Sequence, residues 1–162
     1  MTKRVEANDP IVMRKMGLFH CSKADYAKAF QYWTKAAGLG DASAHYHLAH
    51  MHRNGKHVEK DMKRTIYHWE EAAISGDTKS RYNLGCVEWN ENSKERAVKY
   101  FIIAANLGDD ESVKALKHGY AMGLLSKDDY AEALRTYQAA VDATKSPQRE
   151  AACKSSFSFG EK

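Results

Sequence analysis

The sequence predicts an all-α protein built as a solenoid of about four helix-turn-helix repeats. Its 162 residues are enough for one domain with a substantial core. Proline occurs only at positions 10 and 147, and a long proline-free stretch rich in alanine favours helices. The same short pattern also returns several times along the chain, which is typical of repeat proteins.

The returning pattern consists of an aromatic residue, small alanines and, in three copies, Gly-Asp. It reads DYAKAFQYWTKAAGLGD at 25–41, DMKRTIYHWEEAAISGD at 61–77, ERAVKYFIIAANLGDD at 95–110 and DDYAEALRTYQAAVDA at 128–143. The aromatic positions, spaced 36, 32 and 36 residues apart, are Trp33, Trp69, Phe101 and Tyr137. Each copy predicts the second helix of a unit, in which alanines allow neighbouring helices to approach closely.

The units follow one another without long linkers. Each glycine suits a left-handed position after a helix, and the following aspartate can cap the next helix. In the first unit, Asn8 or Asp9 is the expected cap and Pro10 opens a helix that runs to about His20. We therefore predict units at about 9–40, 41–76, 77–108 and 109–144, preceded by a flexible N-terminus at 1–8.

The segment 145–162 departs from the repeat. Ser146 and Pro147 predict the start of a separate capping helix with residues 148–153 as its body, followed by a flexible tail. A competing interpretation makes Phe157 and Phe159 a docking motif, or a handle that enters the groove of another copy and produces weak self-association.

Several motif positions occur together in the middle units. Unit two carries Ala44, Leu48, Gly55, Val58, Asp61, Trp69, Ala72, Ala73 and Gly76, and unit three carries Ser80, Leu84, Gly85, Ala97, Phe101, Ala104, Ala105 and Gly108. These residues resemble the Sel1-like repeat family, a relative of the tetratricopeptide repeat, over about 135 residues. Departures include His57 in place of a loop glycine, a shorter unit three, and units one and four that match only in their second helices.

The resemblance implies a right-handed α-solenoid and a role as an adaptor or scaffold for protein partners, without catalysis. In some eukaryotic members a cysteine-rich zinc-binding module precedes such an array, and these residues contain no such cysteines. The formal charge of +4 permits an acidic partner but does not require one. Three widely separated cysteines and the absence of a long apolar run or an apolar leader predict an intracellular, cytoplasmic protein.

First helices line the concave side in this architecture. A helical wheel of unit two places Ala44, Leu48 and Ala49 on the packed side. The opposite positions predict a partner-binding surface formed by Ser43, Tyr46, His47, His50, Arg53, Lys79, Tyr82, Asn83, Cys86, Trp89, Glu111, Lys114 and His118. This polar, aromatic and mildly basic set favours an acidic or polar peptide or protein, although Tyr46 and Tyr82 can also be read as packing residues.

Four histidines in HYHLAHMH, residues 45–52, raise the question of a metal. His45 and His52 share the packed face, whereas His47 and His50 lie opposite. Stacked helices about 10 Å apart would place His50, Cys86 and His118 in a row rather than around one ion, so we expect no metal and no cofactor.

Other function classes have little support. No hydrolase or phosphate-binding motif is present, so no enzyme is expected, and basic residues are interleaved with acidic ones, so nucleic acid is an improbable ligand. The alternative function is that of a structural subunit in a larger complex, packing through its convex helices and its C-terminal tail.

Overall fold

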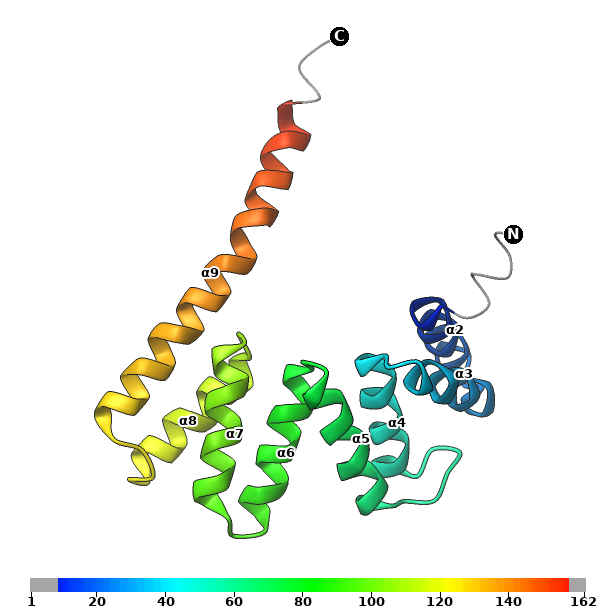
Figure 1. The fold of residues 1–162 in the computed structure, drawn as a ribbon, viewed down its shortest axis with the longest axis horizontal. Coiled ribbons are helices and arrows are strands. Elements are labelled where there is room, and N and C mark those ends of the chain that lie inside the picture. Colours follow the sequence, from blue (N-terminus) through cyan, green and yellow to red (C-terminus); the bar gives the residue numbers. More distant parts are fainter. Residues whose placement is uncertain (1–8, 158–162) are drawn as a thin grey trace. The chain divides into compact units, whose positions relative to one another are not determined.

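A computed structural model describes the backbone of residues 9–157 and the side chains of residues 9–145. In this range every regular element is a helix, so the expected all-α class is confirmed (Figure 1). The helices are α2 (Pro10–Ser22), α3 (Tyr26–Gly38), α4 (Ala42–Asn54), α5 (Met62–Ile74), α6 (Thr78–Asn90), α7 (Lys94–Asn106), α8 (Asp110–Ala121) and α9 (Lys127–Phe157). None of these helices has the length and apolar character needed to span a membrane. The expected flexible segment at 1–8 and Phe159 lie outside the described residues.

Aspartates start the helices as the sequence predicts. The backbone N–H of Ala44 donates to Asp41 Oδ1 at 2.7 Å, and the N–H of Ser112 donates to Asp109 Oδ2 at 2.8 Å. Gly40, which directly precedes Asp41, has a φ of 86°, a left-handed conformation that other residues rarely adopt. The Gly-Asp pair thus ends one helix and begins the next.

Small residues allow each second helix to lie close to its partner. The indole of Trp33 on α3 lies so close to Gly17 on α2 that a Cβ at that position would overlap it. Phe101 on α7 covers Gly85 on α6 in the same way. Trp33 and Phe101 are 3% and 2% exposed and Trp69 is 2% exposed, so the aromatic positions of the first three units form part of the core.

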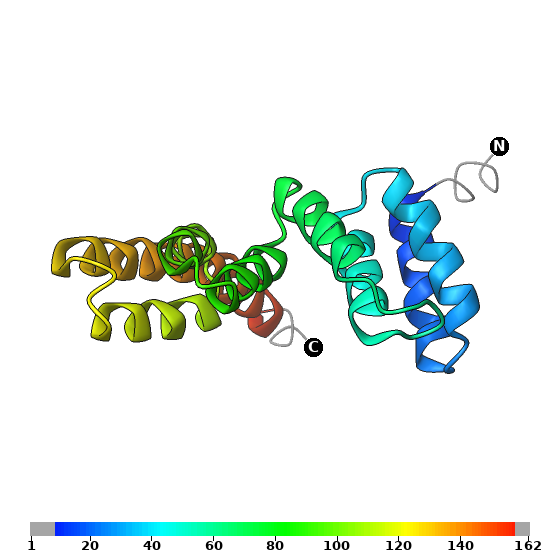
Figure 2. The same cartoon turned by 90° about the horizontal axis from the view of Figure 1, so that it is seen from below.

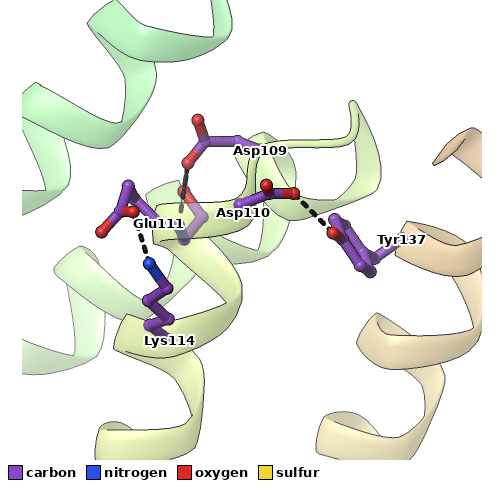
Figure 3. Close-up of polar contacts among 6 residues, drawn as sticks. Asp109, Asp110, Glu111, Lys114 and Tyr137 are labelled. Atoms are coloured by element: carbon purple, nitrogen blue, oxygen red, sulfur yellow. Dashed lines mark hydrogen bonds and ion pairs between the residues drawn. The ribbon is translucent and has the colours of Figure 1, made fainter.

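The chain divides into two compact units, one up to Leu84 and one from Gly85. In the first unit α2 packs on α3, α3 on α4 and α4 on α5. Figures 1 and 2 both show α2 and α3 side by side. In the second unit α7, α8 and α9 pack on one another. Tyr137 on α9 donates a hydrogen bond to Asp110 at the start of α8 (Figure 3).

The structure differs from the sequence prediction at the end of the chain. No separate helix begins at residue 146, because α9 continues without interruption from Lys127 to Phe157. Proline inside a helix removes one backbone hydrogen bond. The alanines and other strong helix formers on both sides of Pro147 favour continuation of the helix. The segment expected as a capping helix is therefore the last part of α9.

Candidate partner-binding surface

Helix α4 is the element around which the surface is built in the first unit. One side of α4 packs against α3 through Ala44, Leu48 and Met51, which are almost fully buried. Another side faces α5 and carries His45 and His52, so these two histidines do lie on a packed side as predicted. The remaining side of the helix carries Tyr46, His50 and Arg53, which are half-buried or exposed.

Three of the predicted residues form one aromatic and basic strip on that side. The rings of Tyr46 and His50 meet edge to face with centroids 4.5 Å apart. The ring centroid of His50 lies 6.2 Å from that of Trp69 on α5. The guanidinium of Arg53 lies 5.6 Å from the Trp69 ring centroid, in range of a cation–π contact. Ser43 is half-buried one turn before this strip.

The surroundings of His50 favour its neutral imidazole. Burial lowers the pKa of His50, and the nearby positive charge of Arg53 lowers this pKa further. Its Nε2 atom is buried and has no hydrogen-bond partner. A buried polar atom without a partner is costly, so this nitrogen would gain from a hydrogen bond to a bound group.

His47 has a different setting from the one expected. Its ring stacks on Trp33 with centroids 4.6 Å apart and an interplanar angle of 15°, so it is part of the contact between α3 and α4. Burial lowers the pKa of His47, with a smaller contribution from His50. His47 therefore contacts Trp33 of α3 instead of standing free on the open side of α4.

A pocket of about 130 Å³ opens between α2, α3 and α4. Its lining residues are Cys21, Tyr26, Trp33, His47, His50, Met51, Asn54 and Lys56. An apolar cavity of about 150 Å³ can hold a benzene ring, so this space suits one aromatic or branched aliphatic side chain. The Nζ atom of Lys56 lies 5.2 Å from the Tyr26 ring centroid and brings a positive charge to the pocket. Sequence reasoning missed the pocket, because residues from three helices create it.

The first part of α6 continues the predicted set within the first unit. Lys79 is exposed, whereas Tyr82 and Asn83 are half-buried. Asp77 raises and Lys79 lowers the pKa of His50, so both charges act on the α4 strip. The local charge is consequently mixed, and Lys79 and Arg53 are its exposed cations.

The predicted residues of the second unit form two groups. The ring centroids of Trp89 and His118 are 5.6 Å apart, and Lys94 Nζ lies 5.8 Å from the Trp89 ring centroid. Cys86 is half-buried. Lys114 donates to Glu111 at 2.6 Å, and this bond raises the pKa of Lys114 (Figure 3). The Glu111 carboxylate offsets the charge of Lys114. Lys114 should therefore attract an acidic partner less strongly than the sequence predicts.

A second histidine group lies on the other side of α4. The Nδ1 atoms of His45 and His68 are 3.0 Å apart, and the rings of His52 and His68 stack at 5.7 Å. His68 was missed because it belongs to α5 and shares no spacing signal with the α4 histidines. Within the described residues, no group of three or more His, Cys, Asp or Glu side chains is arranged to hold a metal ion.

Comparisons with known proteins agree with this architecture. The Sel1 repeat model matches residues 12–41, 42–77 and 79–109. A Sel1 repeat protein from Oxalobacter formigenes is similar in structure, with a TM-score of 0.69, 29% identity, and coverage of 88% of this chain and 62% of its own. A protective antigen from uropathogenic Escherichia coli with an SLR fold has a TM-score of 0.69 and 23% identity, over 84% of this chain and 32% of its own. This chain thus spans under two thirds of either protein, and no curated protein matches it.

Proposed function

The chain belongs to the Sel1 repeat family, and we propose that it binds a protein or peptide partner through the surface of its first helices. Sel1 repeat proteins are generally non-catalytic scaffolds for protein–protein interaction. The observation that carries the proposal is the pocket beside α4, where Trp33, Met51 and His50 border one space. Our proposal assigns no catalytic role to this chain.

The pocket and its surroundings define the chemistry of the partner. An aromatic or branched side chain would fill the space next to Trp33 and Met51. Acidic residues beside that side chain would meet Lys56, Arg53 and Lys79, which are all exposed cations. We therefore propose an acidic segment with one apolar anchor as the ligand.

A substitution that closes the pocket tests this proposal. Asn54 is exposed and borders the pocket, so Asn54→Trp should fill its mouth without disturbing the core. We expect partner capture from native cells to fall at least about tenfold with Asn54→Trp, which is typical of losing a central anchor. Lys79→Glu should weaken the same interaction, mainly through slower association.

Lys99→Glu on α7 is the matched control, because Lys99 is an exposed lysine outside the predicted surface. Equal capture by the wild type and Asn54→Trp would rule out the pocket as the anchor site. A selective loss with Lys114→Glu would move the site to the second unit.

The alternative function, a structural subunit that packs through other helices, has one observation in its favour. Ile74 at the end of α5 is 78% exposed and Ile103 on α7 is 43% exposed, and both belong to second helices. If Ile74→Asp or Ile103→Asp abolishes capture while Asn54→Trp does not, this alternative replaces groove binding. Removal of residues after 150 tests the proposed weak self-association through Phe157 and Phe159, read as the oligomeric state.

We make two further proposals about this chain, its location and its fourth unit. We place the protein inside the cell, in the cytoplasm, where the half-buried thiols Cys21 and Cys86 would stay reduced. We also count 109–144 as a fourth unit, since α8 and the first part of α9 pack as a helix pair beyond the matched repeats.

A further inference from the structure

The outer side of α2 is apolar and open to solvent. Val12, Met16 and Phe19 lie on one side of the helix at positions i, i+4 and i+7 and are 38%, 37% and 54% exposed. Neighbouring Ile11 and Leu18 are 49% and 42% exposed. Five exposed apolar side chains on one 13-residue helix form an apolar patch, a feature that marks interaction sites.

In two other first helices, α4 and α8, the side chains at the equivalent positions are buried. Counted from the capping aspartate, Val12, Met16 and Phe19 correspond to Ala44, Leu48 and Met51 of α4. Those three residues are only 0%, 2% and 4% exposed. The same positions in α8 are Ser112, Leu116 and Gly119, which are also buried. An equivalent side of the helix is thus covered in α4 and α8 and open in α2.

The covering element is known for α4. Ala44, Leu48 and Met51 share one core cluster with Trp33 and Ala36 of α3, the second helix of the preceding unit. In α8 the covering element is α7, whose Phe101 and Ala105 occupy the positions of Trp33 and Ala37. In α4 and α8 this side of the first helix is therefore covered by an alanine-rich second helix with one aromatic residue at the repeat position.

We propose that the α2 seat, formed by Val12, Met16 and Phe19, binds the second helix of a further Sel1-type unit supplied by a partner protein. This binding would extend the array across two polypeptides. It uses a different surface from the α4 strip and does not depend on the partner proposed there.

The residues of the seat specify the incoming helix further. Lys15 of α2 occupies the position of His47, which stacks on Trp33 in the α3–α4 contact. An exposed ammonium at this point would sit against the aromatic ring of the incoming helix, as a cation–π contact. Val12 is larger than Ala44, so the incoming helix must be small at its alanine pair.

A tandem duplication of residues 9–40 tests the seat. Joining Gly40 of the first copy to Asp9 of the second reproduces the Gly-Asp junction that connects α3 to α4. The second copy of α2 then meets a preceding second helix, whereas the first copy stays open. We expect Phe19→Asp in the second copy to lower the Tm by about 5 °C, and the same change in the first copy to lower it by about 1 °C or less.

Oxidation supplies a readout that does not depend on unfolding. Met16 in the second copy should react with hydrogen peroxide several-fold more slowly than Met16 in the first copy, measured by mass spectrometry with Met16→Leu in the other copy. Equal Tm shifts for the two Phe19→Asp variants, equal oxidation of the two methionines, or a duplicate that adds no helix by circular dichroism would overturn the proposal.

Sedimentation of the unduplicated chain tests whether a second copy of it supplies the helix. A monomer at micromolar concentration is the result expected when the helix comes from a different protein. A dimer that disappears with Phe19→Asp would make a second copy of this chain the occupant and would contradict the proposal.

Discussion

The Nδ1 atoms of His45 and His68 lie 3.0 Å apart across the contact between α4 and α5. At this distance one imidazole must donate its N–H and the other must accept through its lone pair. His52 stacks on His68 from the same side of α4, and Arg64 adds a positive charge nearby. A proton added to this group has no acidic residue to balance it among the groups that act on His68.

This arrangement predicts that the first unit loses stability in mild acid. Burial, followed by the positive charges of His45, His52 and Arg64, lowers the pKa of His68 to about 4. Between pH 6.5 and pH 4 the unfolded chain binds a proton at this position and the folded chain does not, so stability falls as the pH falls. After allowance for partial exposure, we expect His68 to contribute about 1 kcal/mol of the loss between pH 7 and pH 5.

Urea unfolding at pH 7 and pH 5 measures this loss. His68→Gln cannot titrate but can still hydrogen-bond to His45, so the variant should lose about 1 kcal/mol less than the wild type over that range. His118→Gln, at an exposed histidine on α8 outside this group, is the matched control. If His68→Gln and the wild type lose stability in parallel, His68 is not the acid-sensitive group.

Glycines beneath the aromatic residues should tolerate no side chain. Gly17→Ala would drive a methyl group into the indole of Trp33, and Gly85→Ala would do so into Phe101. We expect each change to destabilise the protein by about 1–3 kcal/mol, despite the better helix propensity of alanine. Thermal unfolding followed by circular dichroism would measure this.

Gly38→Ala is the matched control for that prediction. Gly38 is also helical, but a Cβ there would meet nothing within 4 Å. This variant should be neutral or more stable by about 0.5 kcal/mol. A Gly17→Ala protein that is as stable as Gly38→Ala would show that α2 and α3 can separate without cost.

The repeat could be predicted from the sequence because it depends on local signals that occur several times. Gly40 ends one helix through its left-handed backbone, and the Asp41 carboxylate caps the next. Trp33 recurs as Trp69 and Phe101 with the spacing of one unit. The end of α9 was predicted less well. Pro147 is a weak local signal, and the helix formers around it outweigh it.

The candidate surface could be predicted only in part. The helical wheel assigns His52 to the packed side and Arg53 to the open side, because these assignments follow from helix periodicity. It cannot show that His47 stacks on Trp33 or that Lys114 pairs with Glu111, because these contacts depend on side-chain rotamers and on the approach of other helices. The pocket beside α4 was missed for the same reason.

Two capping aspartates allow a cap to be separated from an ion pair. Asp41 caps α4 and also lies 3.1 Å from Arg14 Nε, with its side chain only 9% exposed. Arg14 Nε is within ion-pair distance but has no well-aligned hydrogen bond, so its charge depends on Asp41. Asp109 caps α8 through Ser112 and has no ion pair among the described residues.

We expect Asp41→Ala to cost about 2 kcal/mol, since it removes the cap and leaves Arg14 without its counter-charge, whereas Asp109→Ala should cost about 1 kcal/mol. Asparagine is also a good N-cap, so Asp109→Asn should be nearly neutral and Asp41→Asn should still cost about 1 kcal/mol through Arg14. Urea midpoints of the four variants measure these differences, provided that their m values agree. Equal costs for the two asparagine variants would mean that the Arg14–Asp41 pair adds nothing and that α4 is held at its start by the cap alone.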